Sequence, residues 1–196
     1  LAALETAGPD VNVWEMDTII GKNGSDEKCV LSLLHRRSNL QLYFFLRHKN
    51  MFEVTYLFDT IKSFLGIDLF KDTFTIILTD NGTEFHNLLS LETDPETGEK
   101  LISIYFARSR RSDDKGKCEK NHEHFREKVP KGCSMNSLTK YDINFVSNQV
   151  NNYVRRKLNY QSPYSIAKLV LNEKVLELNR LHPISPKAVD LTPILH

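Results

Sequence analysis

Short runs of apolar residues dominate the first half of the chain and predict β-strands. Residues 11–20 alternate loosely between apolar and polar side chains, which favours a first strand. Residues 29–35 and 40–48 predict two more strands, and the polar turn RRSN between them favours an antiparallel hairpin. Two further runs, 74–79 and 101–107, predict a fourth and a fifth strand.

A helical spacing of apolar residues separates the third predicted strand from the fourth. Over residues 51–66 the apolar positions recur three to four residues apart, which predicts a helix with one apolar face. Gly66 ends the pattern, as a glycine often does after the last helical turn. The predicted apolar face contains Phe52, Tyr56, Phe58 or Ile61, and Phe64-Leu65.

The second half of the chain is more polar and helical in its spacing. It predicts helices at roughly 117–128, 139–158 and 163–171, whereas residues 91–101 are turn-rich and predict a surface loop or hairpin. Three strands, a helix, two strands and then helices are typical of an α/β domain. Such an order predicts a mixed five-stranded sheet whose faces are covered by helices.

Composition adds little to this pattern but excludes some classes of protein. The 196 residues, 40% of them hydrophobic and 26% charged, suit one globular domain with a single core. We expect residues 1–171 to form that domain. We expect residues 172–196, which contain Pro183, Pro186 and Pro193, to be a largely extended tail. No apolar run approaches the roughly 20 residues of a membrane-spanning helix.

Charge, cysteine content and the first residues bear on partners and location. A net charge of +1 gives no general argument for a nucleic-acid partner, so such an argument has to come from local clusters. The three cysteines are sparse and odd in number, which suits reduced thiols in a cytoplasm, and no signal-peptide layout opens the chain. Because the chain does not begin with Met, we expect a fragment of a longer protein.

Three carboxylates lie at positions that suit a metal site. Asp17 lies on the first predicted strand, Asp80 ends the fourth, and Glu119 opens a polar helix. If the two strands are neighbours, both aspartates reach one edge of the sheet. Carboxylates that converge repel one another unless a cation lies between them, and hard oxygen ligands suit Mg²⁺. The alternatives are a simple turn at Asp80-Asn81-Gly82 and a favourable helix-dipole contact at Glu119.

The segments around these acids carry a resemblance to a known family. WEMDTIIGK, TDNGTEF, and GKCEKN followed by REKVPKG resemble the three catalytic motifs of the integrase-core (DDE) transposases of bacterial insertion sequences. The insertion-sequence-thirty family is the most similar. The likeness runs from about Val13 to the end of the chain and includes VNNYVRRKLNYQSPYSIA and DLTPIL. Each motif alone is weak, but three in the same order are specific. The resemblance implies a ribonuclease-H-like fold, in agreement with the predicted element order.

The resemblance also implies an activity. The family's three catalytic acids fall on Asp17, Asp80 and Glu119, which would hold two Mg²⁺, or Mn²⁺, for DNA strand cleavage and strand transfer. The implied partners are transposon ends and target DNA, with a homo-oligomer as the active form and no membrane. The implied location is the bacterial cytoplasm, in association with the nucleoid. Sequence-specific recognition in this family lies in an N-terminal helix-turn-helix region, which is not visible in this sequence.

The chain departs from the family pattern just before Glu119. The residues RSR at 108–110 replace His-Pro-Tyr, Asp113 replaces a Trp, and Cys118 and His122 replace asparagines. These changes keep the three acids but alter the expected handling of DNA. Two alternatives therefore stay open: a ribonuclease-H-like nuclease that does not join strands, and a catalytically inactive DNA-binding or assembly module.

Other polar residues near the motifs are candidates for supporting roles. Glu15, Asn81 and Glu84 flank the acids and are candidates to orient the metal ligands or their waters, or else are turn and surface residues. Two basic clusters are candidates for phosphate contact, the first more strongly because the second also suits a helix C-terminus. Their members are Arg108, Arg110, Arg111, Lys115, Lys117 and Lys120 in the first, and Arg155, Arg156 and Lys157 in the second.

A zinc site is a weaker hypothesis for the same region. Cys118 and His122 are four residues apart, and His124 and Cys133 follow. Two histidines that are two residues apart on a helix point in different directions, which disfavours zinc. We also expect Trp14 and the strand LYFFL to belong to the core and not to a stacking platform for bases.

Overall fold

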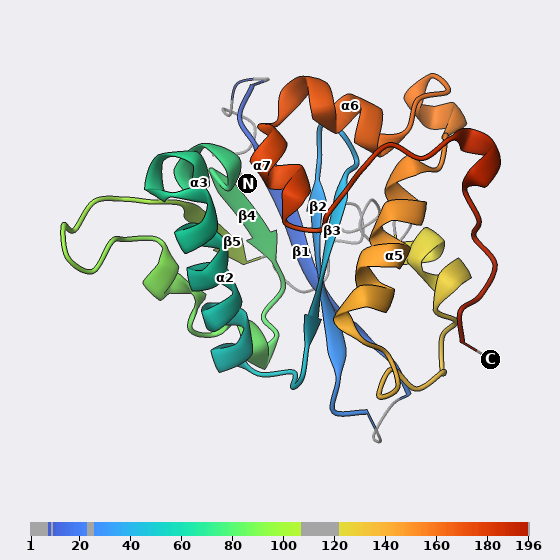
Figure 1. Cartoon of the computed structure of the whole chain (residues 1–196). Helices are drawn as coiled ribbons and strands as arrows, with labels where there is room; N and C mark the ends of the chain where they lie inside the picture. Colours follow the sequence, from blue (N-terminus) through green and yellow to red (C-terminus); the bar gives the residue numbers. More distant parts are fainter. Residues whose placement is uncertain (1–7, 9, 23–25, 107–121, 196) are drawn as a thin grey trace.

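A five-stranded mixed sheet forms the centre of the molecule (Figure 1). The computed structural model describes residues 8, 10–22, 26–106 and 122–195. The predicted fold class is confirmed, because the five strands have the expected order along the chain. They are β1 (Val13–Ile20), β2 (Cys29–His35), β3 (Gln41–Leu46), β4 (Ile76–Thr79) and β5 (Ser103–Phe106).

The strands lie in the order β3-β2-β1-β4-β5. The first three form the predicted antiparallel meander, and β4 and β5 add in parallel to β1. Parallel addition needs a crossover, which the helices between β3 and β4 provide. As a result β1 and β4 are neighbours, and their carboxyl ends lie at the same edge of the sheet.

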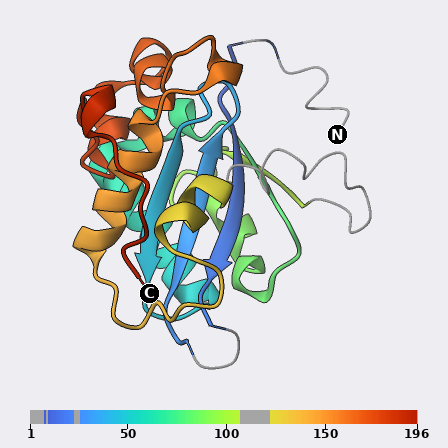
Figure 2. The same cartoon turned by 90° about the vertical axis from the view of Figure 1, so that its right-hand side faces the viewer.

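Helices cover both faces of this sheet. Residues in α2 (Met51–Leu65), α3 (Ile67–Thr73), α6 (Pro163–Val170) and α7 (Glu173–Glu177) pack with β1 side chains such as Trp14 in one buried cluster. Helical residues 122–128 and α5 (Lys140–Asn152) pack on the other face around Tyr43 and Val146. Figure 2 shows this second layer crossing in front of β2 and β3. None of the described helices has both the length and the apolar character needed to cross a membrane.

Trp14 belongs to the core, as predicted. Its side chain is fully buried, and its indole nitrogen donates a hydrogen bond to the Thr73 carbonyl at 2.6 Å. The ring packs against Phe74, with 5.3 Å between centroids. A buried indole needs such a polar partner, and here the partner ties β1 to the end of α3.

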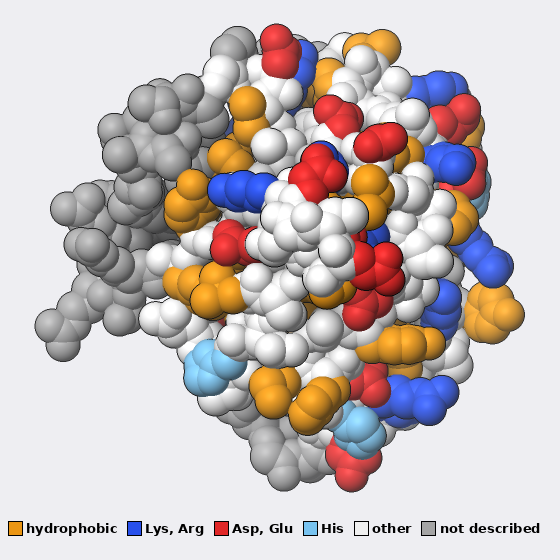
Figure 3. All heavy atoms as spheres, turned by 90° about the vertical axis from the view of Figure 1, so that its left-hand side faces the viewer, with side chains coloured by type: hydrophobic (Ala, Val, Ile, Leu, Met, Phe, Trp, Pro, Cys, Tyr) orange, Lys and Arg blue, Asp and Glu red, His pale blue; other side chains and the backbone are white. Residues whose placement is uncertain are grey.

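The predicted apolar face of α2 was partly wrong. The buried residues are Val54, Phe58, Ile61 and Leu65, whereas Phe52 and Tyr56 are 71% and 74% exposed and Phe64 is 46% exposed. Both sets fit a period of 3.6 residues, so periodicity alone does not choose between them. Figure 3 shows hydrophobic side chains exposed among charged ones on the side of the molecule that carries α2 and α3.

The ends of several helices also differ from the prediction. Gly66 ends α2 as expected, with φ of 81°, but a second helix, α3, follows at once. The helix predicted to reach residue 158 ends at Asn152, and residues 156–158 form a separate 3₁₀ turn. The segment after Asn172 is not simply extended, because α7 forms there and Val175 and Leu176 join the core.

Two asparagine side chains occupy the outer edge of β3. The Asn151 amide accepts from the Gln41 backbone N–H at 2.8 Å and donates to the Gln41 carbonyl at 2.7 Å. Asn179 binds the Tyr43 backbone in the same two-bond manner, at 2.6 and 2.9 Å. Each amide therefore acts as a neighbouring strand would, and these edge groups are satisfied without a further strand.

A buried histidine makes the stability of the fold depend on pH. His35 is fully buried, and its ring nitrogens lie 2.8 Å from the Ser38 hydroxyl and 3.1 Å from the Asn12 side-chain oxygen. Burial lowers the pKa of His35 from 6.5 to about 4. The unfolded chain therefore binds one more proton than the folded chain between these two values.

We expect the titration of His35 to lower the free energy of unfolding by about 3 kcal/mol as the pH falls from 6.5 to 4. Above pH 6.5 this loss of stability is absent, because His35 is then neutral in both the folded and the unfolded chain. Urea unfolding at several pH values measures the loss, and the same series on His35→Gln should show a shallower pH dependence in this window. An equal slope in the two proteins would contradict the assignment to His35.

Candidate active site

The register of β1 and β4 brings two of the predicted acids side by side. Val13, Trp14 and Glu15 pair in parallel with Ile76, Ile77 and Leu78, a constant offset of 63 residues. The same offset continued by two residues places Asp80, just after β4, beside Asp17. Paired residues of neighbouring strands point to the same face and lie about 5 Å apart. The register thus confirms that the two strands are neighbours, and the convergence of the two carboxylates on a shared cation stays a prediction.

Each aspartate is oriented by a nearby backbone amide. Asp17 Oδ1 accepts from the Thr18 N–H at 2.8 Å, and Asp80 Oδ1 accepts from the Gly82 N–H at 3.1 Å. The second contact is the Asx turn that the Asp-Asn-Gly sequence favours. The turn and the ligand interpretations of Asp80 are therefore compatible, because the turn holds the carboxylate at the strand end.

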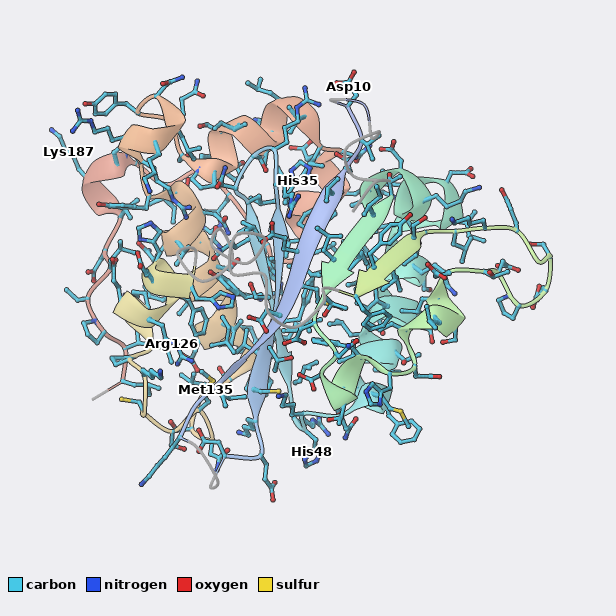
Figure 4. All side chains as sticks on the ribbon, turned by 180° about the vertical axis from the view of Figure 1, so that it is seen from behind. Asp10, His35, His48, Arg126, Met135 and Lys187 are labelled. Carbon is cyan, nitrogen blue, oxygen red and sulfur yellow. The ribbon has the colours of Figure 1, made fainter. Side chains whose placement is uncertain are left out.

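The helical residues 122–128 face Asp17. His122 Nδ1 lies 3.8 Å from Asp17 Oδ2, and Arg126 donates a hydrogen bond to the Ile20 carbonyl at 2.8 Å. Figure 4 shows Arg126 near the carboxyl end of β1, whereas His35, at the end of β2, lies near the amino end of β1. The third predicted acid, Glu119, and the first basic cluster (Arg108, Arg110, Arg111, Lys115, Lys117 and Lys120) lie outside the described residues.

The three residues expected to support the acids have different environments. Glu15 is 5% exposed and forms an ion pair with Arg36, with 2.6 Å between Oε1 and Nε. It lies two residues before Asp17 and therefore on the same face of β1. Asn81 is exposed, in the loop after Asp80. Glu84 is 3% exposed and contacts β1 from the opposite face of the sheet, because Thr18 is its partner there.

Sequence reasoning missed the partners of Glu84. Its Oε1 accepts from the Thr18 hydroxyl at 2.8 Å and lies 3.1 Å from Lys49 Nζ. The three residues come from the first strand, the β3–α2 turn and the loop after β4. A signal was available, because a glutamate four residues after Asp80 stands directly before the buried Phe85. Its partners were not predictable without the fold.

The second basic cluster is less uniform than its sequence suggests. Arg155 is only partly exposed and donates to the Val150 carbonyl at 3.3 Å, and burial lowers the pKa of its guanidinium. It thus supports the carboxyl end of α5, as expected for a cation at that position. Arg156 and Lys157 are exposed. These two residues are the members of the cluster best placed for a phosphate contact.

The donor chemistry of the site fits a hard divalent cation. Two carboxylates share one face of the sheet, and carboxylate oxygens are preferred ligands of Mg²⁺ and Mn²⁺. Within the described residues, no group of three or more His, Cys, Asp or Glu side chains gathers as a metal site. His122, His124 and Cys133 therefore form no zinc site among themselves, and Cys118 lies outside the described residues.

Comparisons with known proteins show which sequences and folds this chain resembles. No protein-family model matches the chain. The chain is 26% identical over 156 residues to the probable transposase for insertion-like sequence element IS1161 of Streptococcus salivarius. The matched region covers 80% of this chain and 41% of that protein. The chain is 28% identical over 160 residues to the transposase for insertion sequence element IS4351 of Bacteroides fragilis, covering 81% and 45%. The chain thus spans less than half the length of these relatives.

Solved structures with a similar fold are retroviral integrases. The catalytic core domain of BIV integrase matches with a TM-score of 0.53 and 15% identity, over 80% of this chain and 93% of that one. A chain of the simian T-cell lymphotropic virus intasome in complex with PP2A regulatory subunit B56 gamma matches with a TM-score of 0.53 and 12% identity, over 80% and 54%. The chain therefore has the ribonuclease-H-like fold of an integrase catalytic core, and its sequence is similar to those of insertion-sequence transposases, as its three motifs indicated.

Proposed function

We propose that this chain is the catalytic core of a DNA transposase that cleaves DNA and transfers the cut strand in a Mg²⁺-dependent reaction. The observation that carries the proposal is the β1–β4 register, which pairs Glu15 with Leu78 and, if continued by two residues, sets Asp80 beside Asp17 on one face of the sheet. The similarity to insertion-sequence transposases supports DNA as the substrate. The proposed partners are transposon ends and target DNA, with a homo-oligomer as the active form. The proposed location is the bacterial cytoplasm.

The proposed roles of the residues follow from their chemistry. Asp17 and Asp80 would hold divalent cations together with Glu119, which completes the three-acid motif in the sequence. Bound cations would activate water or a DNA 3′-hydroxyl and stabilise the leaving oxygen. The Thr18 and Gly82 amides keep the two aspartates in fixed orientations, which reduces the reorganisation needed when a cation binds. Mn²⁺ has the same ligand preferences and should substitute for Mg²⁺.

Two rival functions differ in a measurable way. A nuclease that does not join strands would cleave DNA with Mg²⁺ but would leave a supplied 3′-hydroxyl end unjoined. A catalytically inactive DNA-binding or assembly module would bind DNA without needing Asp17 or Asp80. An oligonucleotide assay with pre-cut ends and a target duplex separates the three. Joined products that require Mg²⁺ support the proposal. DNA binding without cleavage or joining would contradict it.

We expect this chain to bind DNA weakly, without sequence preference and with a strong dependence on salt. Each phosphate contact contributes about −0.9 to the slope of log affinity against log salt concentration on duplex DNA. The triple variant Arg108→Ala/Arg110→Ala/Arg111→Ala should therefore reduce the magnitude of the slope by about 2 to 3 and weaken all sequences alike. Binding isotherms at several salt concentrations measure this slope.

A charge-matched control is available on exposed residues of other elements. Arg37→Ala/Lys168→Ala/Lys187→Ala removes the same charge from the turn after β2, from α6 and from the C-terminal segment. Figure 4 shows Lys187 on the side opposite the long loop between β4 and β5. We expect this control to keep the wild-type slope. An unchanged slope in the Arg108 triple variant would mean that DNA enters elsewhere.

A further inference from the structure

A buried carboxylate belongs to the loop that follows Asp80. Glu84 is in the 3₁₀ turn Thr83–Phe85 and is 3% exposed, although Asn81 and Thr83 in the same loop are exposed. Burying a carboxylate costs several kcal/mol unless its charge and hydrogen-bonding capacity are satisfied. An apolar residue would fill the same space at lower cost. The presence of a carboxylate here therefore calls for a reason beyond packing.

The contacts of Glu84 connect the two segments that carry the aspartates. One carboxylate oxygen, Oε1, accepts a hydrogen bond from Thr18, which is the residue after Asp17 on β1. The same oxygen lies 3.1 Å from the Lys49 ammonium, which balances the buried charge. Glu84 itself is four residues after Asp80. A single side chain thus ties the Asp80 loop to the strand of Asp17, at the position next to that aspartate.

The second carboxylate oxygen of Glu84 acts on the same loop through Gly82. Oε2 is buried and has no hydrogen-bond partner among the described residues. A Cβ atom added to Gly82 would lie 2.7 Å from Oε2, and its three nearest atoms would all belong to the Glu84 carboxylate. The Gly82 φ of −59° is available to any L-residue, so backbone freedom does not call for a glycine here, whereas an added methyl group would displace the end of the Glu84 side chain.

Gly82 is also the residue that orients Asp80. Its N–H donates the hydrogen bond to Asp80 Oδ1, and the Glu84 carboxylate occupies the space that a side chain of this residue would take. On the other side, the Thr18 N–H donates to Asp17 Oδ1 while the Thr18 hydroxyl donates to Glu84. The two amides in these hydrogen bonds therefore belong to Thr18, which donates to Glu84, and to Gly82, whose open side the Glu84 carboxylate fills.

We infer that Glu84 is a positioning residue that sets the separation and orientation of Asp17 and Asp80 for cation binding. This inference rests on the proposed function. Glu84 contacts the sheet on the face opposite the aspartates and would not itself be a ligand of a bound cation. It acts through Thr18 and Gly82, with Lys49 as the neutralising partner. Outer residues of this kind typically change metal affinity by about 10- to 100-fold when they are removed.

The inference is tested by two measurements on the same variants. The first is Mn²⁺ binding, followed by electron paramagnetic resonance. The second is hydrogen exchange of the Thr18 and Gly82 amides without metal, followed by NMR. Glu84→Ala should weaken Mn²⁺ binding by about tenfold or more and speed exchange of both amides. Thr18→Val should weaken Mn²⁺ binding by several fold, on the order expected for a lost orienting contact. Thr18→Ser should bind Mn²⁺ as the wild type does, because it keeps the hydroxyl.

A double-mutant cycle identifies the carboxylate as the group through which Gly82 acts. Gly82→Ala should weaken Mn²⁺ binding in the wild-type background, because the added methyl group displaces Glu84. The same change should have little further effect in the Glu84→Ala background, where the steric conflict is absent. Asn179→Ala is the control for general destabilisation. It removes a buried side chain at the far edge of the sheet and should leave both readouts unchanged at a temperature where the protein is folded.

The outcomes separate this inference from the proposed function. Unchanged Mn²⁺ affinity and unchanged amide exchange in Glu84→Ala and Thr18→Val would overturn the inference while leaving the transposase proposal intact. If wild-type protein binds no Mn²⁺ but both amides exchange faster in these variants, the positioning contacts stand and the metal-dependent function fails. Equal effects in Asn179→Ala would also overturn the inference, since the changes would then reflect stability alone.

Discussion

Asp80→Asn should abolish Mg²⁺-dependent DNA cleavage and leave the protein folded. The amide keeps the size of the side chain and an oxygen that accepts from the Gly82 N–H, so the turn after β4 is retained. It loses the negative charge that binds a cation. We expect cleavage to slow by at least about a thousandfold, or about 4 kcal/mol of transition-state stabilisation. The unfolding free energy should change by less than about 0.5 kcal/mol.

A second Asx turn provides a matched control for this substitution. Asp94 Oδ1 accepts from the Glu96 and Thr97 backbone amides at 2.9 Å in the exposed loop after residue 91. Asp94→Asn makes the same chemical change in the same kind of turn, but outside the site. Its cleavage rate should equal that of the wild type. If Asp80→Asn unfolds the protein, or cleaves as fast as Asp94→Asn, Asp80 is only a turn residue.

Asn151→Ala should be among the most destabilising single substitutions of an uncharged residue in this chain. Asn151 is fully buried, and its side chain satisfies both the N–H and the carbonyl of Gln41 on the outer edge of β3. Alanine leaves the Gln41 N–H without its partner and leaves the carbonyl with only the longer hydrogen bond from the Ser147 hydroxyl, at 3.4 Å. Each poorly satisfied buried group costs about 1 to 3 kcal/mol. We expect a loss of about 3 to 4 kcal/mol and a fall in the melting temperature of about 10 °C.

Thermal and urea unfolding of three proteins measure this effect. Asn87→Ala is the control, because Asn87 is exposed and its side chain makes no capping hydrogen bond to the following 3₁₀ turn. It should unfold within about 0.5 kcal/mol of the wild type. We also expect Asn151→Ala to be more prone to association, since an unsatisfied strand edge pairs readily with another chain. A loss below about 1 kcal/mol would mean that water replaces the amide without cost.

Much of the fold was predictable because its strands are short and strongly apolar. β2 is buried along its whole length, and its run of apolar residues, interrupted by Ser32 and ended by His35, indicates this in the sequence. The face of α2 was not predictable, because Val54 and Phe52 both fit a helical period. α3 was missed because Gly66 is both the C-cap of α2 and the residue that precedes the next helix. Tertiary packing decides such cases.

The candidate site divides in the same way. That Asp17 and Asp80 belong to neighbouring strands was predictable, because strand ends and turn residues are local features and three motifs in order carried the resemblance. Their role as metal ligands stays a prediction. Thr18 and Lys49 were not predictable as partners of Glu84, because they are 66 and 35 residues away in the sequence. The same is true of Asn151 and Asn179, whose amides bind backbone groups more than 100 residues away. Hydrogen bonds of this range leave no periodic signal.

Cation binding by the metal-free protein tests the central claim most directly. Mn²⁺ is titrated into the wild type, Asp17→Asn, Asp80→Asn and the control Asp94→Asn, and bound Mn²⁺ is measured by electron paramagnetic resonance. If the two aligned aspartates share a cation, the wild type and Asp94→Asn bind Mn²⁺ alike, Mg²⁺ competes for the same site, and each active-site variant loses binding by about a hundredfold, which corresponds to about 2.7 kcal/mol. Equal Mn²⁺ binding in all four proteins would contradict the account.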